Sequence, residues 1–398
     1  MSYLKFQATQ LFTGTEMRGP DAVLVTDEQG KIVEIIHKEE GGENIQQLNG
    51  ILTPGFINCH CHLELSHMKG LVPEQTGLVD FVFKVVNERH FPEEEIAAAI
   101  SAGENEMLTN GIVGVGDICN NLSTLPQKKL NRLAYYNFIE VSGWLPAVAE
   151  IRWEKSLDFY HAFNNIQHLQ FTLQNALVPH APYSVSNELW KLMAPYFSGK
   201  TISIHNQETS FEDDLFLSGT GDFNRMYRIM QMDTSFFTPT GKSSLQSYIE
   251  KLNRARNVLL VHNTFMREED VVAVSRQSSV NSQSFYYCLC VNANRYIENA
   301  IPPIDMFRKH HAEMVIGTDS LASNRQLSIL DELKTIGCNF PSIPLNELLQ
   351  WATHNGAKAL QMDDRLGSFE KGKMPGVLIL EQLENGIIGG GTTVRRLI

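Results

Sequence analysis

The chain has 398 residues, of which 43% are hydrophobic and 20% charged, a composition typical of a globular protein with a large core. Its formal net charge of −12 argues against nucleic acid or an anionic membrane as a partner, although not against a small nucleoside. The first residues lack a signal-peptide pattern, and no apolar run approaches membrane-spanning length, so we expect a cytoplasmic protein.

The first and last segments of the chain contain short strand-like runs. Residues 22–36 are typical of two strands around a turn at Gly30, and residues 377–380 and 393–398 are strand-like at the other end. These runs predict a second, smaller unit beside one large domain.

An apolar run over residues 54–62 contains two histidines, His60 and His62. Because successive side chains of a strand alternate between faces, both imidazoles point to one side, and Cys59 and Cys61 point to the other. Two imidazoles at one strand end form half of a metal site, whereas the cysteines are expected to pack as small hydrophobic side chains. Hydrogen-bonded core histidines are the alternative, but two adjacent imidazoles in an apolar strand would then need partners.

Seven later apolar runs also end in polar residues, mostly after stretches of helical character. Near-continuous apolar runs that alternate with helices indicate parallel strands buried on both faces, and eight such strands suggest a closed (β/α)8 barrel. In that fold the carboxyl ends of the strands carry the active site. The seven later runs end at or near Asp117, Glu140, His180, Glu208, His262, Asn292 and Asp319.

The connection formed by residues 211–252 is long for a barrel loop and contains an expected helix from about Ser243. Long connections in compact domains are usually functional or mobile. This segment is therefore a candidate cover for the substrate.

Five motifs stand at these strand ends in order, and a further signature follows at residues 351–360 and 367–377. With them the chain resembles the metal-dependent amidohydrolase superfamily, in its branch of purine and pyrimidine deaminases and chlorohydrolases, over nearly its whole length. Many relatives carry Ala-Asp where this chain has Pro375-Gly376, a difference confined to a structural segment. The motifs contain His60 and His62, then His180, then His205 with Glu208, then His262, and finally Asp319 with Asn324.

The resemblance implies an α/β fold in two parts. Residues 53–369 would form a (β/α)8 hydrolase barrel that holds the metal. Residues 1–52 and 370–398 would join in a small β-sandwich domain built from both termini.

The resemblance also implies one divalent metal held by His60, His62, His205 and Asp319. Three imidazoles and one carboxylate suit zinc, with iron and manganese as alternatives. Dinuclear relatives often carry a lysine at the end of the fourth strand, and its absence here favours a single metal. Taken alone, Asp319 also fits the N-cap of a following helix.

Catalytic and substrate roles follow from the same resemblance. His262 would hydrogen-bond the attacking water, Asp319 would accept its proton, and Glu208 would protonate the ring nitrogen beside the carbon under attack. His180 would contact the substrate. The alternatives are a second metal for His262, a solvated loop position for Glu208 and a turn-capping role for His180.

Other residues are weaker candidates for substrate contacts. Glu64 follows the metal histidines and Asn324 follows Asp319, and either side chain could equally order its own loop. Arg225, Arg228 and Arg295 are candidates for a substrate carboxylate or phosphate, although an exposed arginine is usually only solvated.

The implied function is that of a zinc-dependent hydrolytic deaminase of an amino-substituted purine nucleoside, releasing ammonia. A 5′-modified adenosine such as aminodeoxyfutalosine is favoured, because residues 77–84 differ from the Trp-containing stretch common in deaminases of S-adenosylhomocysteine. The alternatives are a chlorohydrolase, a deaminase of a guanine, cytosine or triazine type of ring, and a metal-free scaffold, which the complete ligand set disfavours. The expected partner is a small molecule, not nucleic acid or a membrane, and a homodimer is compatible with the sequence.

Overall fold

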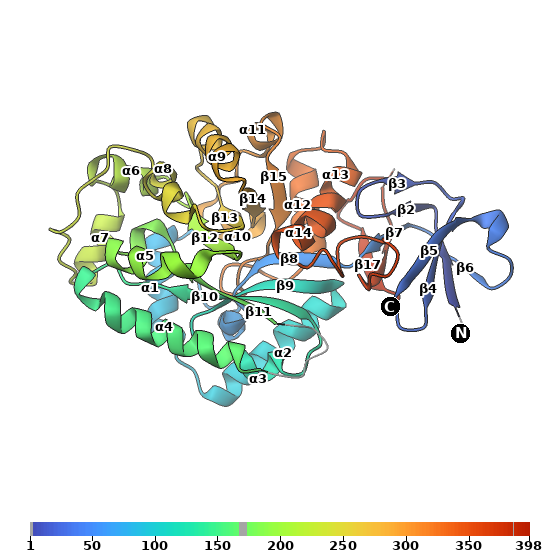
Figure 1. Ribbon diagram of the computed structural model, residues 1–398, viewed down its shortest axis with the longest axis horizontal. Helices are drawn as coiled ribbons and strands as arrows, with labels where there is room; N and C mark the ends of the chain where they lie inside the picture. The colour runs from blue at the N-terminus through green and yellow to red at the C-terminus, as the bar shows by residue number, and fades with distance from the viewer. Residues whose placement is uncertain (1–2, 167–172, 385) are drawn as a thin grey trace.

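The computed structural model describes residues 3–166, 173–384 and 386–398. A large body of strands and helices carries a small part made of strands at one end, and both chain termini lie in that small part (Figure 1). Among the described residues, no helix is both long enough and apolar enough to cross a membrane.

The large body is built on two four-stranded parallel sheets, with strand orders β11-β10-β9-β8 and β12-β13-β14-β15. Nearly every residue of these strands is buried, as expected for strands covered on both faces. They correspond one by one to the eight apolar runs of the sequence. Their bounds are β8 Phe56–Cys61, β9 Ile112–Cys119, β10 Ala134–Val141, β11 Gln174–Pro179, β12 Thr201–Asn206, β13 Asn257–His262, β14 Ser284–Leu289 and β15 Glu313–Ile316.

Backbone contacts join the two sheets on both sides. After β11, the His180 carbonyl accepts a hydrogen bond from the His205 N–H of β12 at 3.0 Å. After β15, the N–H groups of Thr318 and Asp319 both donate to the His60 carbonyl of β8 at 3.0 Å. The residues at these junctions are the strand-end residues that the sequence singled out.

Helices alternate with these strands. They pack onto the core through buried apolar side chains, as α12 illustrates. In α12, the Ser328 side chain accepts from the Asp331 N–H and caps the helix, and Ile329, Leu333 and Ile336 face the core. The helices are α1 Leu78–Glu88, α2 Glu93–Thr109, α3 Leu125–Lys128, α4 Ala149–Asn164, α5 Asn187–Met193, α9 Glu268–Asn281, α10 Val291–Glu298, α11 Ile304–Lys309, α12 Ile329–Asn339, α13 Leu345–Gln350 and α14 Gly356–Ala359.

Single turns of 3-10 helix and one π-helical turn complete the connections. The π-helical turn, η7 Trp351–Asn355, falls on the tail signature and packs against β8 and β15. The 3-10 turns are η1 Lys38–Glu40, η2 Leu63–Met68, η3 Pro146–Val148, η4 Pro182–Ser184, η5 Ala194–Phe197 and η6 Ile249–Leu252.

The long connection after β12 folds into α6 Phe211–Ser218, α7 Phe223–Ile229 and α8 Ser244–Tyr248. The last of these lies where the sequence predicted a helix, and the Ser243 side chain caps it by accepting from the Gln246 N–H. The labels α6, α7 and α8 lie together at the end of the molecule opposite the small part (Figure 1).

The small part contains two sheets that share one hydrophobic core. Their strand orders are β5-β4-β1-β6 and β17-β16-β7-β2-β3, and β16 near the C-terminus pairs antiparallel with β7 near the N-terminus. Phe6, Leu24 and Ile379 are among the residues of the shared core. The strands are β1 Tyr3–Gln7, β2 Gln10–Phe12, β3 Met17–Arg18, β4 Ala22–Asp27, β5 Ile32–His37, β6 Ile45–Gln47, β7 Ile51–Pro54, β16 Val377–Glu381 and β17 Thr393–Arg396.

Candidate active site

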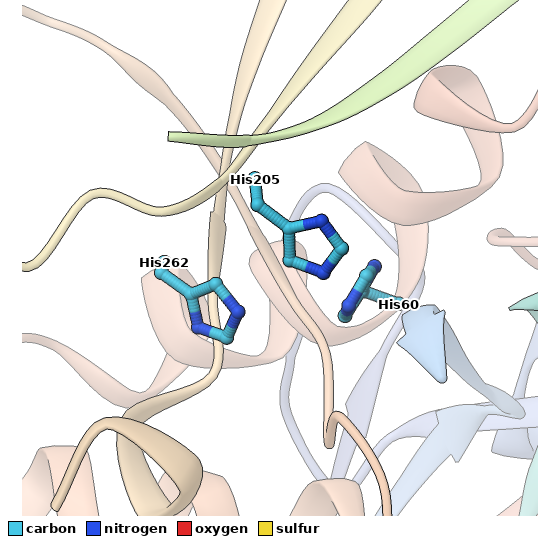
Figure 2. A group of neighbouring side chains, drawn as sticks. All are labelled: His60, His205 and His262. Atoms are coloured by element: carbon cyan, nitrogen blue, oxygen red, sulfur yellow. The ribbon is translucent and has the colours of Figure 1, made fainter. Parts of the chain in front are cut away.

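The four predicted metal ligands converge at the strand ends. His60 and His62 come from the end of β8, His205 from β12, and Asp319 from the turn after β15. Metal-binding atoms of His60, His62 and Asp319 lie within 4.8 Å of one another, and so do those of His60, His205 and His262. Figure 2 shows the rings of His60, His205 and His262 grouped together, and His60 belongs to both sets.

Some polar atoms of the cluster have no hydrogen-bond partner within the described part of the chain. Within the described residues, both ring nitrogens of His60 and Nδ1 of His62 are buried without a hydrogen-bond partner. Asp319 Oδ1 lies 3.6 Å from His60 Nε2 and 3.4 Å from His62 Nε2. Buried polar groups without partners are costly and rare. A divalent metal among these four side chains would bind one nitrogen of each imidazole, and their donor set suits zinc.

Protonation also favours metal binding. Burial lowers the pKa of His62 to about 3 and holds the pKa of His205 well below its ordinary value, so both imidazoles are neutral at pH 7. Burial acts in the opposite direction on Asp319, but its contacts with His60 and His62 hold the carboxyl pKa well below its usual range. Neutral imidazoles and an ionised carboxylate are the forms that bind a metal.

Hydrogen bonds behind the cluster fix the orientation of two ligands. His205 Nδ1 lies 2.7 Å from the backbone carbonyl of His180, which leaves Nε2 to face the cluster. The Ser323 hydroxyl donates to Asp319 Oδ2. These contacts set the tautomer of His205 and restrain the Asp319 carboxylate.

His262 and Asp319 both adopt the left-handed backbone region, with φ of 73° and 57°. This region is uncommon for residues other than glycine, and strained backbone of this kind gathers at functional sites. His262 Nδ1 contacts Asn294 Oδ1 at 2.7 Å, and His262 Nε2 lies 3.6 Å from Glu208 Oε1. The imidazole therefore stands between the metal ligands and Glu208, a position that suits both roles considered from the sequence.

A glycine and two cysteines make room for His60. A Cβ on Gly317 would lie 2.9 Å from the sulfurs of Cys288 and Cys290 and from the Cβ of His60. Cys59 and Cys61, which flank His60 in the sequence, are free thiols and fully buried. The cysteines thus pack as small apolar side chains, as expected, and the strands approach closely at the metal cluster.

A cavity of about 600 Å³ opens over the cluster, and His62, His205, His262 and Asp319 line it. Glu208 lines it as well and is only 4% exposed. Burial raises the pKa of Glu208 well above its ordinary value, with a smaller contribution from Asp319, so this site favours the protonated form of the carboxyl. A protonated carboxyl beside the metal ligands can donate that proton to a bound molecule.

The structure brings two of the three predicted substrate contacts to the cavity. His180 and Glu64 line it, and burial lowers the pKa of His180 to about 4 and raises that of Glu64 to about 7. Asn324 is not among the lining residues. Its side-chain amide donates to the Thr318 carbonyl at 2.8 Å and to Glu332 Oε1 at 2.9 Å, which ties down the turn that carries Asp319.

The arginines that the sequence suggested do not line the cavity. Arg225 is bound to Asp80 and Asp222, with its Nη1 2.8 Å from Asp80 Oδ1. Other cations, Arg89, Arg152 and Lys155, line the cavity instead. These three residues lie at helix ends or on helix surfaces, where the local sequence does not distinguish a cavity-lining cation from a solvated one.

The long connection forms part of the cavity wall, as expected for a cover. Met226, Tyr227, Met230 and Met232 from this segment line the cavity. Tyr227 stacks on Trp144 with ring centroids 5.4 Å apart, which joins the segment to the loop after β10.

Residues 51–390 match the family model described as the Amidohydrolase family. The chain belongs to this family. The match covers the strands and turns that hold the candidate metal ligands, and the family is one of hydrolases that act on carbon–nitrogen bonds. The family shown by this match is the superfamily that the site motifs indicated.

Similar proteins include an adenosine deaminase of Helicobacter pylori, 28% identical over 334 residues, which are 82% of this chain and 77% of the relative. An aminodeoxyfutalosine deaminase of Nitratiruptor sp. is 25% identical over 293 residues, which are 72% of this chain and 67% of the relative. The solved structure of Helicobacter pylori aminofutalosine deaminase in complex with methylthio-coformycin superposes with a TM-score of 0.78 and 25% identity, over 96% of this chain and 93% of that one.

Proposed function

We propose that this amidohydrolase is a zinc-dependent deaminase of an adenosine-type nucleoside, in which water replaces the ring amino group and ammonia leaves. One observation carries the proposal: a buried cluster of four candidate metal-ligand side chains and the buried carboxyl of Glu208, whose pKa is raised, lie at one cavity. The deaminase relatives, at modest identity, support the same reaction.

The roles of the residues follow from their positions. A bound divalent metal would lower the pKa of a water molecule to about 7, so that the nucleophile is available at neutral pH. Asp319, ionised and beside His60 and His62, accepts a proton as the water oxygen attacks the carbon that bears the amino group. Glu208 donates its proton to the neighbouring ring nitrogen, where it stays in the keto product. Of the two protons of the water, one then goes to the leaving amine and the other restores the Glu208 carboxyl, which leaves Asp319 ionised again.

His262 orients the attacking water in this proposal. Its Nδ1 is occupied by Asn294, so its Nε2 faces the space between Glu208 and the metal ligands. The C–N bond breaks when the tetrahedral centre collapses, which yields the keto purine and ammonia. Chloride displacement would use the same nucleophile, but chloride leaves as an anion and needs no proton, whereas the amino group must gain a proton to leave as ammonia.

The proposed substrate is a 5′-modified adenosine such as aminodeoxyfutalosine. The cavity extends beyond the candidate metal ligands. Its walls include the apolar side chains of Phe81, Val82 and Phe159. Arg89, Arg152 and Lys155 add positive charge, and within the described residues none of them forms an ion pair. A 5′ substituent with an apolar stem and an anionic end suits this wall.

We further infer the domain organisation that accompanies this function. Hydrogen bonds between the two parallel sheets on both sides support a closed (β/α)8 barrel of residues 53–369. The core shared by the two outer sheets supports a small β-sandwich domain of residues 1–52 and 370–398. Triazine hydrolase, with a TM-score of 0.73 at 16% identity, shares the fold and adds nothing on the substrate.

The test is ammonia release by the zinc-loaded protein with adenosine, neutral and anionic 5′-modified adenosines including aminodeoxyfutalosine, guanine and cytosine. We expect release from 5′-modified adenosines, with the highest kcat/KM for an anionic substituent. If the metal-loaded protein released ammonia from none of these compounds, the nucleoside proposal would be rejected. Chloride release from a chlorotriazine would then favour the chlorohydrolase reaction.

A further inference from the structure

Glu140 at the end of β10 is a cavity residue that the proposed reaction does not use. It lines the cavity and is 5% exposed. Its Oε2 accepts a hydrogen bond from Asn120 Nδ2 at 2.8 Å. Its Oε1 lies 3.5 Å from His205 Nδ1, but that nitrogen already contacts the His180 carbonyl at 2.7 Å. Within the described residues, Glu140 Oε1 therefore receives no hydrogen bond.

A second buried acid holds this arrangement in place. The backbone N–H of Asn120 donates to Glu64 Oε2 at 3.1 Å, while the side chain of the same residue holds Glu140. Asn120 thus bridges two carboxyl groups that belong to the ends of two strands. The bridge fixes one oxygen of Glu140 and leaves the other free for a ligand.

The Glu140 carboxyl lies near two histidines of the cavity wall. Ligand atoms of Glu140, His180 and His205 lie within 4.8 Å of one another. His180 Nδ1 contacts Ser184 Oγ at 2.7 Å, so its Nε2 is the nitrogen left for the cavity. A second metal fits poorly here, because the nearest nitrogen of His205 is used by the His180 carbonyl, and two ligand atoms make an incomplete site.

We propose that Glu140 is a substrate-binding residue that accepts a hydrogen bond from a ribose hydroxyl, with His180 beside it to meet the neighbouring hydroxyl. A vicinal diol is neutral, supplies two adjacent hydroxyl groups and matches the paired carboxylate and imidazole. Asn120 and Glu64 act as positioning residues. The inference rests on the proposed nucleoside deaminase function and assigns the part of the site that holds the sugar.

Glu140→Gln is tested with the best nucleoside of the panel and with its 2′,3′-dideoxy analogue. Burial raises the pKa of Glu140 to about 7, so the assays are run at pH 8, where the carboxylate predominates. A hydrogen bond to this charged acceptor corresponds to roughly a tenfold to hundredfold change in affinity. We expect KM for the ribonucleoside to rise by about that factor, while kcat changes by less than about threefold. For the dideoxy analogue, KM should be equally high in the wild type and in the variant, because the hydroxyl that Glu140 would bind is already missing.

Glu104→Gln is the matched control. Glu104 is fully buried and accepts from the Tyr135 hydroxyl at 2.8 Å and from Gln127 Nε2 at 2.6 Å, away from the cavity. It should lower stability and leave KM unchanged.

The outcomes separate this inference from the proposed function. A wild type that is active on both nucleosides with equal KM overturns the inference alone, and this comparison needs no variant to fold. An equal loss in Glu140→Gln for both nucleosides also overturns it, since the effect would not depend on the hydroxyls. A wild type that deaminates no nucleoside rejects the function and the inference together.

Discussion

Two clusters of buried polar side chains lie at neighbouring strand ends and differ in how completely they are satisfied. Lys128 Nζ lies 2.5 Å from Asp117 Oδ2 and donates to Asn137 Oδ1 at 2.7 Å. His60 is as fully buried as Lys128, yet within the described residues neither of its ring nitrogens has a hydrogen-bond partner. Both clusters are withdrawn from water, but only the first contains its own partners.

The difference separates a structural cluster from a functional one. A buried lysine and aspartate lose hydration, and close pairing with extra hydrogen bonds offsets that loss. An unsatisfied buried cluster calls for a partner from outside the chain. The two are also connected, because Asp117 Oδ1 accepts the backbone N–H of Leu63, the residue after His62, at 2.9 Å. The paired cluster thus supports the loop that carries the unpaired one.

Asp319→Asn should have the largest effect, because it removes the one ionised ligand of the unpaired cluster. Metal contributes several kcal/mol to such reactions, so we expect activity to fall at least about a thousandfold. Metal per chain, measured by plasma mass spectrometry, should fall with it. The exposed Asp363→Asn should change neither quantity. Stoichiometric metal with full activity in Asp319→Asn would remove Asp319 from the ligand set.

Glu208→Gln separates proton transfer from metal binding. The variant cannot donate the carboxyl proton, and a positioned acid of this kind contributes about a hundredfold to ten-thousandfold in rate. We expect kcat for ammonia release to fall within that range while metal content stays at the wild-type value. Full activity with metal bound would refute the proton shuttle.

Lys128→Met breaks the paired cluster and leaves Asp117 buried without its cation. Removal of one partner of a buried ion pair costs about 3–5 kcal/mol, which urea unfolding would measure. The adjacent Lys129 is exposed, and Lys129→Met should change stability by less than about 0.5 kcal/mol. Equal stability of the two variants would show that the Lys128 cluster is not the structural support described above.

The ligand cluster could be predicted from the sequence because its signals are local. Alternation along a strand places His60 and His62 on one face, and the ends of parallel strands meet at one edge, so polar residues of later strand ends were expected nearby. The family resemblance then singled out His205 and Asp319 among them as ligands. The eight strands were predicted for the same reason, from apolar runs of strand length. These regularities do not depend on which side chains cross from other elements.

The second layer of the site could not be predicted, since its contacts join distant segments. Asn324 was a candidate either for a substrate contact or for ordering its own loop, and Glu332 of α12 and the Thr318 carbonyl hold its amide. Arg225 was a candidate for an anionic group, but Asp80 of α1 pairs with it. Glu140 stood at a predicted strand end, yet its free oxygen became evident only with Asn120 and His205 in place.

Glu332 tests how well neutral hydrogen-bond donors stabilise a buried carboxyl group. It is buried like Lys128, but only neutral donors bind it. It accepts from the Asn292 N–H at 3.0 Å and from Asn324, and burial raises its pKa to about 8. Between pH 4.5 and about 8 the folded state keeps a proton that the unfolded chain has released, so stability falls as pH rises.

Glu332→Gln removes this titration, whereas Glu64, Glu140 and Glu212 keep theirs in both proteins. We expect the metal-loaded variant to gain stability relative to wild type from pH 5 to pH 8, so that its free energy of unfolding exceeds the wild-type value by a growing amount. One unit of pKa difference corresponds to about 1.4 kcal/mol, which urea titrations at the two pH values resolve. The exposed Glu250→Gln should keep the wild-type pH dependence. Parallel pH profiles for wild type and Glu332→Gln would mean that the neutral donors around Glu332 stabilise its carboxylate as fully as Lys128 stabilises Asp117.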